Sequence, residues 1–164
     1  MNDNEKNTNL AYSMSILYED DGSERTWTIY GIPRTKKNSP MIAGTGRKCP
    51  VCGKPAKQWV RQGDVYTNYA ALALMQLEPK PTKPIDYPVN VRCVFYLNTR
   101  RRIDKSNLEA AAHDLLVEAE ILADDNRDII ATTDGSCVLY DREKPRTEIT
   151  ITPLKNYEQW RKEK

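Results

Sequence analysis

Alternating apolar and polar positions predict strands at several places along the chain. Every second residue is apolar over 11–18 and again within 26–32, and a turn sequence of two aspartates and a glycine lies between them. These two segments predict a hairpin. The cleanest alternation covers 89–97 and places Cys93 on the apolar side, in the core. Two more strands are expected over 128–140 and 146–152.

Two other stretches have the 3.6-residue spacing of helices. The first is the Ala- and Leu-rich segment 65–77. The second begins after Asp104 or Ser106, either of which is a good N-cap. Its apolar stripe should face the core and consists of Leu108, Ala111, Ala112, Leu115, Leu116, Ala119 and Leu122. On one flank of that helix the spacing groups three polar residues, Asn107, Asp114 and Glu118.

These elements predict an α/β (α+β) protein with a single mixed β-sheet and helices packed against it, in the order β-β-loop-α-β-α-β-β. One domain is expected over 11–155, after a disordered lead at 1–10 and before a tail at 156–164. Within the domain, 33–63 is predicted to be a long basic loop that contains two cysteines. A loop of that length in a small domain is usually functional or disordered.

Composition narrows the class of protein. The 164 residues are 39% hydrophobic and 29% charged, and no apolar run is long enough to span a membrane. The N-terminus lacks the apolar core of a signal peptide, so a cytoplasmic location is expected. The only histidine, His113, lies in a helical pattern without a companion motif. A hydrolase that uses a Ser-His or Cys-His pair is therefore not indicated.

The charge distribution says more than the net charge of +2. Basic residues gather in the predicted loop and again at 100–105, whereas acidic residues gather at 124–128. Carboxylates suit a hard cation such as Mg²⁺, and neighbouring cations suit phosphate, so the segment 100–128 could serve a phosphodiester nuclease. The alternative is that Asp104 only caps a helix and that Asp124 and Asp125 only form a solvated turn.

The order of these motifs resembles the RusA family of junction-resolving endonucleases. That family has a basic strand end, Asp-x-Asp-Asn opening a helix, an Asp within the helix and an Asp pair after it. The matching positions here are Asp104, Asn107, Asp114, Asp124 and Asp125. The family's Gly-x-Pro-x-x-Lys loop is similar to residues 31–36, and its Tyr-rich helix start resembles Tyr66 and Tyr69. The resemblance covers roughly 27–152.

The resemblance implies a RusA-like fold and an Mg²⁺- or Mn²⁺-dependent endonuclease that cuts four-way DNA junctions in recombination and repair. It also implies a homodimer, since two symmetric cuts suit two-fold symmetry. The implied metal ligands are Asp104, Asp125 and Asp124, and the implied catalytic residues are Asp104, Asp125 and Asp114. The expected DNA contacts are Lys36, Lys37, Arg101, Arg102 and Lys105.

Two positions depart from the family pattern. Ser106 replaces the second Asp, and Ala110 stands where the family has a Lys. A hydroxyl brings no charge to offset a cation, so one ligand and one catalytic cation are missing. Lys105 or Lys36 could replace the lost cation. The alternative is a catalytically weakened RusA-like protein that binds branched DNA without cutting it.

The sequence Cys49-Pro-Val-Cys52-Gly53 has the spacing of half a structural zinc site, which requires four ligands. Three outcomes are open: a site completed within the chain, a four-cysteine site shared across a dimer, or a reduced pair without metal. A third function class follows, a zinc-knuckle nucleic-acid module in which the acidic segment is inert.

Overall fold

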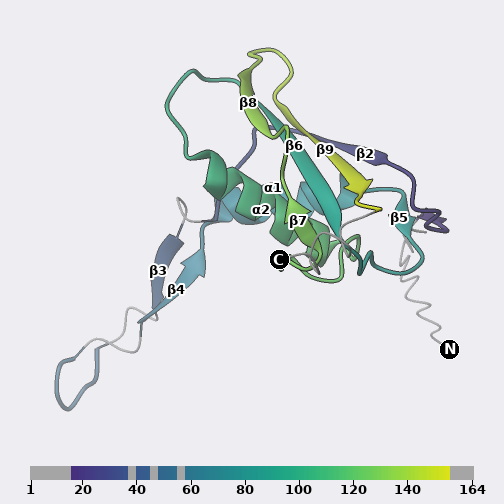
Figure 1. Cartoon of the computed structure of the whole chain (residues 1–164). Helices are drawn as coiled ribbons and strands as arrows, with labels where there is room; N and C mark the ends of the chain where they lie inside the picture. The colour runs from purple at the N-terminus through teal and green to yellow at the C-terminus, as the bar shows by residue number, and fades with distance from the viewer. Residues whose placement is uncertain (1–15, 37–39, 45–47, 55–57, 156–164) are drawn as a thin grey trace, which may run out of the picture.

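A mixed sheet forms the centre of the protein in the computed structural model, which describes residues 16–36, 40–44, 48–54 and 58–155. Strands β2 (Arg25–Tyr30), β9 (Arg146–Pro153) and β6 (Val89–Leu97) are antiparallel neighbours in that order. The other edge of β6 pairs in parallel with β7 (Ile130–Thr132) near its start and with β8 (Cys137–Tyr140) near its end. The predicted mixed sheet is confirmed (Figure 1).

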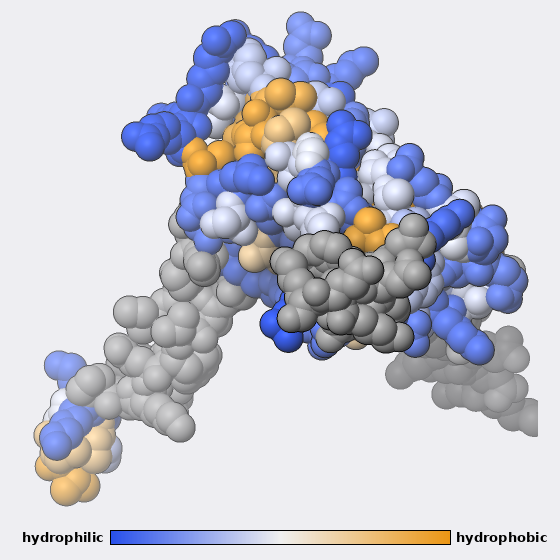
Figure 2. Space-filling view, in the orientation of Figure 1, coloured by the Kyte–Doolittle hydropathy of each residue, from blue (hydrophilic) through white to orange (hydrophobic). Residues whose placement is uncertain are grey.

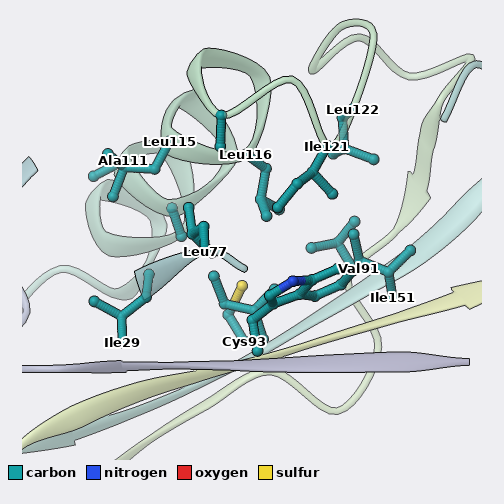
Figure 3. Packing of buried hydrophobic residues seen from close by; sticks show 14 of the residues in the cluster. Ile29, Leu77, Val91, Cys93, Ala111, Leu115, Leu116, Ile121, Leu122 and Ile151 are labelled. Carbon is teal, nitrogen blue, oxygen red and sulfur yellow. The ribbon is translucent and has the colours of Figure 1, made fainter. Parts of the chain in front are cut away.

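Two helices supply the rest of the core, α1 (Asp64–Gln76) and α2 (Lys105–Glu118). Alternate residues of β2, β6 and β9 point toward the leucines of α2, and Figure 3 shows this packing. Leu108 and Leu115 are each 1% exposed and Cys93 is fully buried, as the sequence predicts. Asp104 is the N-cap of α2. The core thus fixes which flank of α2 faces outward.

The predicted hairpin of 11–18 with 26–32 is wrong in its pairing. The described part of the first segment, β1 (Leu17–Tyr18), pairs in parallel with β5 (Lys80–Pro81), and β2 pairs with β9. The reason is that alternation reports which face of a strand is buried but not which strand lies beside it. The short strand β5 lies in the Pro-rich connector, where prolines are tolerated at an edge.

The predicted strand at 128–140 is two strands, β7 and β8, separated by a turn. The Asn90 side chain on β6 accepts hydrogen bonds from the Thr132 hydroxyl and from the Asp134 N–H in this turn. Gly135 has a φ of +82°, which favours glycine. The Asn90 side chain on the neighbouring strand therefore holds the turn between β7 and β8 in place.

The predicted basic loop contains a second, separate sheet. Strands β3 (Pro40–Gly44) and β4 (Gln58–Gln62) form an antiparallel hairpin that projects from the main body (Figure 1). The predicted lead at 1–10 and the tail at 156–164 lie outside the described residues. Among the described residues, no helix is long and apolar enough to span a membrane.

Candidate nuclease site

The N-terminal end of α2 opens beside a basic pocket. The loop after β2 and the loop after β6 enclose about 330 Å³, and three arginines, Arg34, Arg101 and Arg102, line it. Its apolar floor includes Ile32, Leu97 and Ile103. Figure 2 shows an apolar area bordered by hydrophilic side chains over the region where β6, β8 and the loop before α2 meet. Because guanidinium groups match phosphate geometry, this pocket suits a nucleic-acid backbone.

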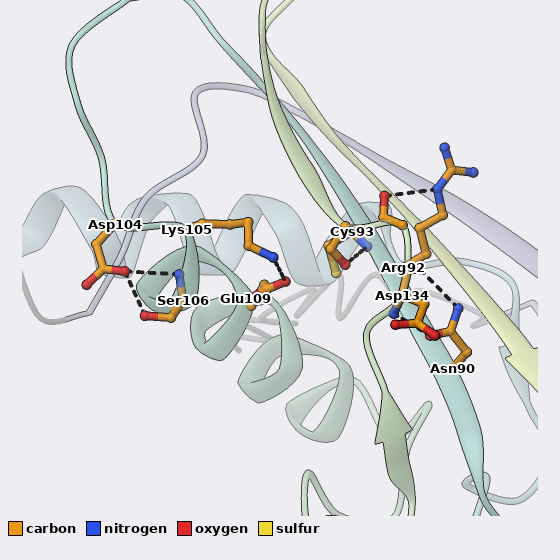
Figure 4. Close-up of polar contacts among 10 residues, drawn as sticks. Asn90, Arg92, Cys93, Asp104, Lys105, Ser106, Glu109 and Asp134 are labelled. Atoms are coloured by element: carbon orange, nitrogen blue, oxygen red, sulfur yellow. Dashed lines mark hydrogen bonds and ion pairs between the residues drawn. The ribbon is translucent and has the colours of Figure 1, made fainter.

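The carboxylate of Asp104 closes the first turn of α2. Its Oδ1 accepts the Ser106 N–H at 3.0 Å and the Ser106 hydroxyl at 2.6 Å (Figure 4). Its Oδ2 accepts the Asn107 Nδ2 at 2.9 Å. Asn107 therefore orients the helix start, and Ser106 supports Asp104 rather than replacing a carboxylate. Lys105, expected to contact DNA, pairs with Glu109 at 2.9 Å.

The middle of α2 carries an ion pair that joins two predicted site residues. Lys36 Nζ, from the loop after β2, lies 2.7 Å from Asp114 Oδ2. The same ammonium is 5.9 Å from the centre of the Tyr66 ring on α1. Burial, together with the nearby charges of Asp114 and Glu118, raises the pKa of Tyr66 to about 12. Lys36, Tyr66 and Glu118 line a shallow groove between the helices.

The loop after α2 forms an acidic turn. Asp124 accepts the Asp125 N–H and the Asn126 side-chain amide, each at 2.8 Å. The Asn126 and Asp125 donors hold the pKa of Asp124 below its usual value. The Asn126 side chain in turn accepts the Asp128 N–H at 2.8 Å. Asp124 and Asp125 are exposed, and carboxylate oxygens suit a hard cation.

Within one chain, α2 separates Asp104 from the acidic turn. Its 14 residues rise about 21 Å. After α2, the Ala123 N–H donates to the Ile85 carbonyl at 3.0 Å, a few residues before β6 begins. The negative charge of Asp125 acts to raise the pKa of His113. His113 lies nine positions after Asp104, or about 13 Å along the helix axis.

A divalent cation holds its oxygen ligands at roughly 2.0–2.6 Å. The expectation that Asp104 and Asp125 of the same chain bind a common ion stays a prediction. In the part of the chain that the structure describes, no group of three or more His, Cys, Asp or Glu is placed to hold a metal.

Sequence reasoning found most of these residues but not their partners. The Lys36–Asp114 pair joins two motifs 78 positions apart, and no local spacing signals it. Arg34 was one of many basic residues in a predicted loop, and its place in the pocket depends on the turn after β2. Lys37, an expected DNA contact, lies outside the described residues.

His113 is a half-buried residue of α2 close to several of these carboxylates. Its Nε2 is buried and makes no hydrogen bond within the described structure. Burial lowers the pKa of His113 more than the charges of Glu109, Asp125 and Asp114 raise it. The imidazole is therefore neutral at neutral pH and sits beside the acidic side of α2.

Comparison with known proteins places this arrangement in a family. No curated protein is similar enough to the chain to count as a match. The family model described as "Endodeoxyribonuclease RusA" matches residues 53–152, more than half of the chain. The match includes α1, the sheet strands β6 to β8, α2 and the acidic turn, and it ends within β9. The chain belongs to the RusA family of endodeoxyribonucleases, the Holliday junction resolvases.

Proposed function

We propose that this protein is a divalent-metal-dependent endonuclease that acts as a homodimer on four-way DNA junctions. The observation that supports it most is the arrangement along α2, with an arginine-lined pocket and the N-cap carboxylate of Asp104 at its start and an acidic turn after its end. Phosphate contacts to Arg34, Arg101 and Arg102 would position the DNA backbone without reading its sequence. When bound, Mg²⁺ or Mn²⁺ would activate water and neutralise charge on the phosphate.

The length of α2 leads us to propose where the ligands come from. A two-fold axis across the middle of α2 reverses the direction of the partner helix. Asp104 of one protomer would then face Asp125 of the partner subunit, with Asp124 as an auxiliary carboxylate. Ser106 and Ala110 on the outer side of α2 are exposed and small, which would permit close approach of two helices.

Lys36 is proposed to supply the cation that Ala110 lacks. Ala110 and Asp114 are one helical turn apart on the same side of α2. The Lys36 ammonium at Asp114 therefore lies about one turn from the position where the family has its Lys. Lys36 and Asp114 would act as a pair, the lysine offsetting charge on the phosphate and Asp114 holding the lysine in place.

The test is cleavage of a synthetic four-way junction with Mg²⁺ or Mn²⁺, beside a linear duplex of the same sequence. Metal-dependent cleavage of the junction alone is expected. The shared site makes a further demand, since Asp104→Asn and Asp125→Asn chains should each be inactive. After subunit exchange, the mixture should regain nicking activity, because each heterodimer has one site with both aspartates. No recovery would reject the shared site, and no cleavage by the native protein would reject the nuclease.

One observation favours a second candidate, a protein that binds junctions without cutting them. Both carboxylate oxygens of Asp104 already accept hydrogen bonds, from Ser106 and from Asn107. If these bonds prevent metal binding, the native protein should bind a junction with no cleavage. The double substitution Ser106→Asp with Ala110→Lys should then create cleavage.

A further inference from the structure

The tip of the β3–β4 hairpin holds two free thiols in a tight turn. The Gly53 N–H donates to the Cys49 carbonyl at 2.9 Å, and the Cys49 N–H donates to the Lys54 carbonyl at 2.8 Å. Gly53 has a φ of +67°, a conformation that glycine adopts at little cost. Cys49 is half-buried and Cys52 is exposed, and neither is in a disulfide. The turn therefore presents both sulfurs at an accessible surface.

The same turn aims backbone donors at one sulfur. The N–H groups of Cys52 and Val51 donate hydrogen bonds to the side chain of Cys49. The Cys52 side chain also bonds that of Cys49, so the two sulfurs lie together. Thiolate is the form that ligates metals, and Cys-x-x-Cys spacing is typical of zinc sites. The local structure is thus that of a preformed two-sulfur half-site.

The other cysteines and the histidine of the chain lie in the main body and not at the hairpin tip. Its sequence contains four cysteines and one histidine. Cys93 is fully buried within β6, Cys137 lies on β8 and His113 on α2. All three belong to the main body, from which the hairpin projects (Figure 1). A structural zinc ion needs four ligands, so the chain by itself provides half.

We propose that one Zn²⁺ joins two copies of this chain at their hairpin tips, bound by Cys49 and Cys52 of each. Charge supports a second copy as the occupant. Lys48 and Lys54 flank the pair and are exposed, so two tips without metal repel each other. A zinc ion with four thiolates has a net charge of −2, which attracts the four lysines of the two tips and removes part of their mutual repulsion. Val51, 93% exposed at the tip, would gain apolar contact there.

This site is independent of the nuclease chemistry. The cysteines precede the residues that match the family model, and the hairpin is separate from α2 and the acidic turn. Activity of the nuclease site is therefore not needed to test the zinc site. The failure of either proposal leaves the other standing.

The experiment is metal analysis of the full-length protein purified without chelators or metal-affinity steps. We expect about 0.5 equivalents of zinc per chain, since each chain supplies two of four ligands. The cobalt-substituted protein should show the intense visible bands of tetrahedral thiolate coordination and sulfur-to-cobalt charge transfer. Cys49→Ser with Cys52→Ser should lose the metal and the bands, while Cys137→Ser should retain both.

Three results would overturn the shared site. The first is the absence of zinc from native protein that has been supplied with zinc under reducing conditions. The second is one zinc per chain, and the third is a cobalt spectrum without four-sulfur character. These measurements use the native chain, so they remain decisive if the double serine variant fails to fold. Circular dichroism and the melting temperature of the Cys137→Ser control would show whether a cysteine-to-serine substitution away from the hairpin leaves the protein folded.

Discussion

The two ends of α2 present opposite charges from one continuous element. At the N-terminal end, Asp104 is held by three hydrogen bonds beside a pocket lined by three arginines. At the C-terminal end, the turn 124–128 exposes three carboxylates, and Arg127 is the one cation within it. The first end suits a phosphate and the second suits a metal cation.

The proposed chemistry needs both kinds of surface at one place. Metal-assisted hydrolysis needs the cation beside the phosphate, whereas the arginine-lined pocket lies at the start of α2 and the acidic turn follows its end. A reversed second helix would bring unlike ends together.

Removing a carboxylate at either end should abolish cleavage if both ends form one composite site. Asp104→Asn and Asp125→Asn should each lower the rate of junction cleavage at least ~100-fold, since metal-based charge stabilisation contributes several kcal/mol. Asp128→Asn in the same turn is the matched control and should change the rate little. Single-turnover cleavage measures this. If Asp125→Asn cleaves like the native protein, the acidic end is only a turn.

DNA affinity should depend on the basic end of α2 and not on the acidic end. Replacing both Arg101 and Arg102 with Gln should weaken junction binding and lower the slope of log K against log salt by about 2, roughly 0.9 for each lost phosphate contact. Arg127→Gln, at the acidic end and 91% exposed, should leave the slope unchanged. Binding titrations in Ca²⁺ over a range of salt concentrations measure both. Equal slopes for the two variants would show that the DNA phosphates do not contact the arginine-lined pocket.

Sequence predicts the body of this protein well because its signals are local. The stripe from Leu108 to Leu122 fixed the orientation of α2, and the alternation over 89–97 placed Cys93 in the core. Asp104 could be identified as a cap because capping is a property of one helical turn. Each of these inferences needs only the residues within a few positions.

Pairing and distance were beyond the sequence because they depend on residues far along the chain. The partner of β1 is β5, some 60 residues later, and the hairpin at 40–62 has no regular alternation that identifies it. The sequence also could not show how the chain runs after α2, because the hydrogen bond of Ala123 with Ile85 joins residues 38 positions apart.

The cap at the N-terminal end of α2 should have a measurable effect on stability. Asp104→Ala removes the acceptor for the Ser106 N–H and should lower the free energy of unfolding by about 1 kcal/mol. Asp104→Asn should be nearly neutral, because asparagine caps helices as well as aspartate does. Urea denaturation of both variants gives the difference. The asparagine variant thus separates loss of chemistry from loss of structure, and equal destabilisation of both would show that the negative charge itself stabilises this end.

At the acidic side of α2, the stability of the protein should depend on pH through His113. Burial lowers the folded-state pKa of this imidazole below the ordinary value of 6.5, despite the nearby carboxylates. Above pH 6.5 neither state binds the proton. As the pH falls below 6.5, the unfolded chain takes up a proton that the folded chain does not, so unfolding becomes more favourable until the folded-state pKa is reached.

His113→Phe should remove this loss, because the buried Nε2 makes no hydrogen bond that phenylalanine would forfeit. The measurement is the free energy of unfolding of both proteins between pH 7.5 and the onset of carboxylate titration, with Asp104→Asn as a background variant at the other end of α2. The expected result is a native-minus-variant difference that falls steadily below about pH 6.5 in either background. A difference that rises instead would mean that the charges of Glu109, Asp125 and Asp114 raise the pKa of His113 more than burial lowers it. The folded chain would then bind the proton more tightly than the unfolded chain, and the carboxylates of the acidic side would dominate the environment of the imidazole.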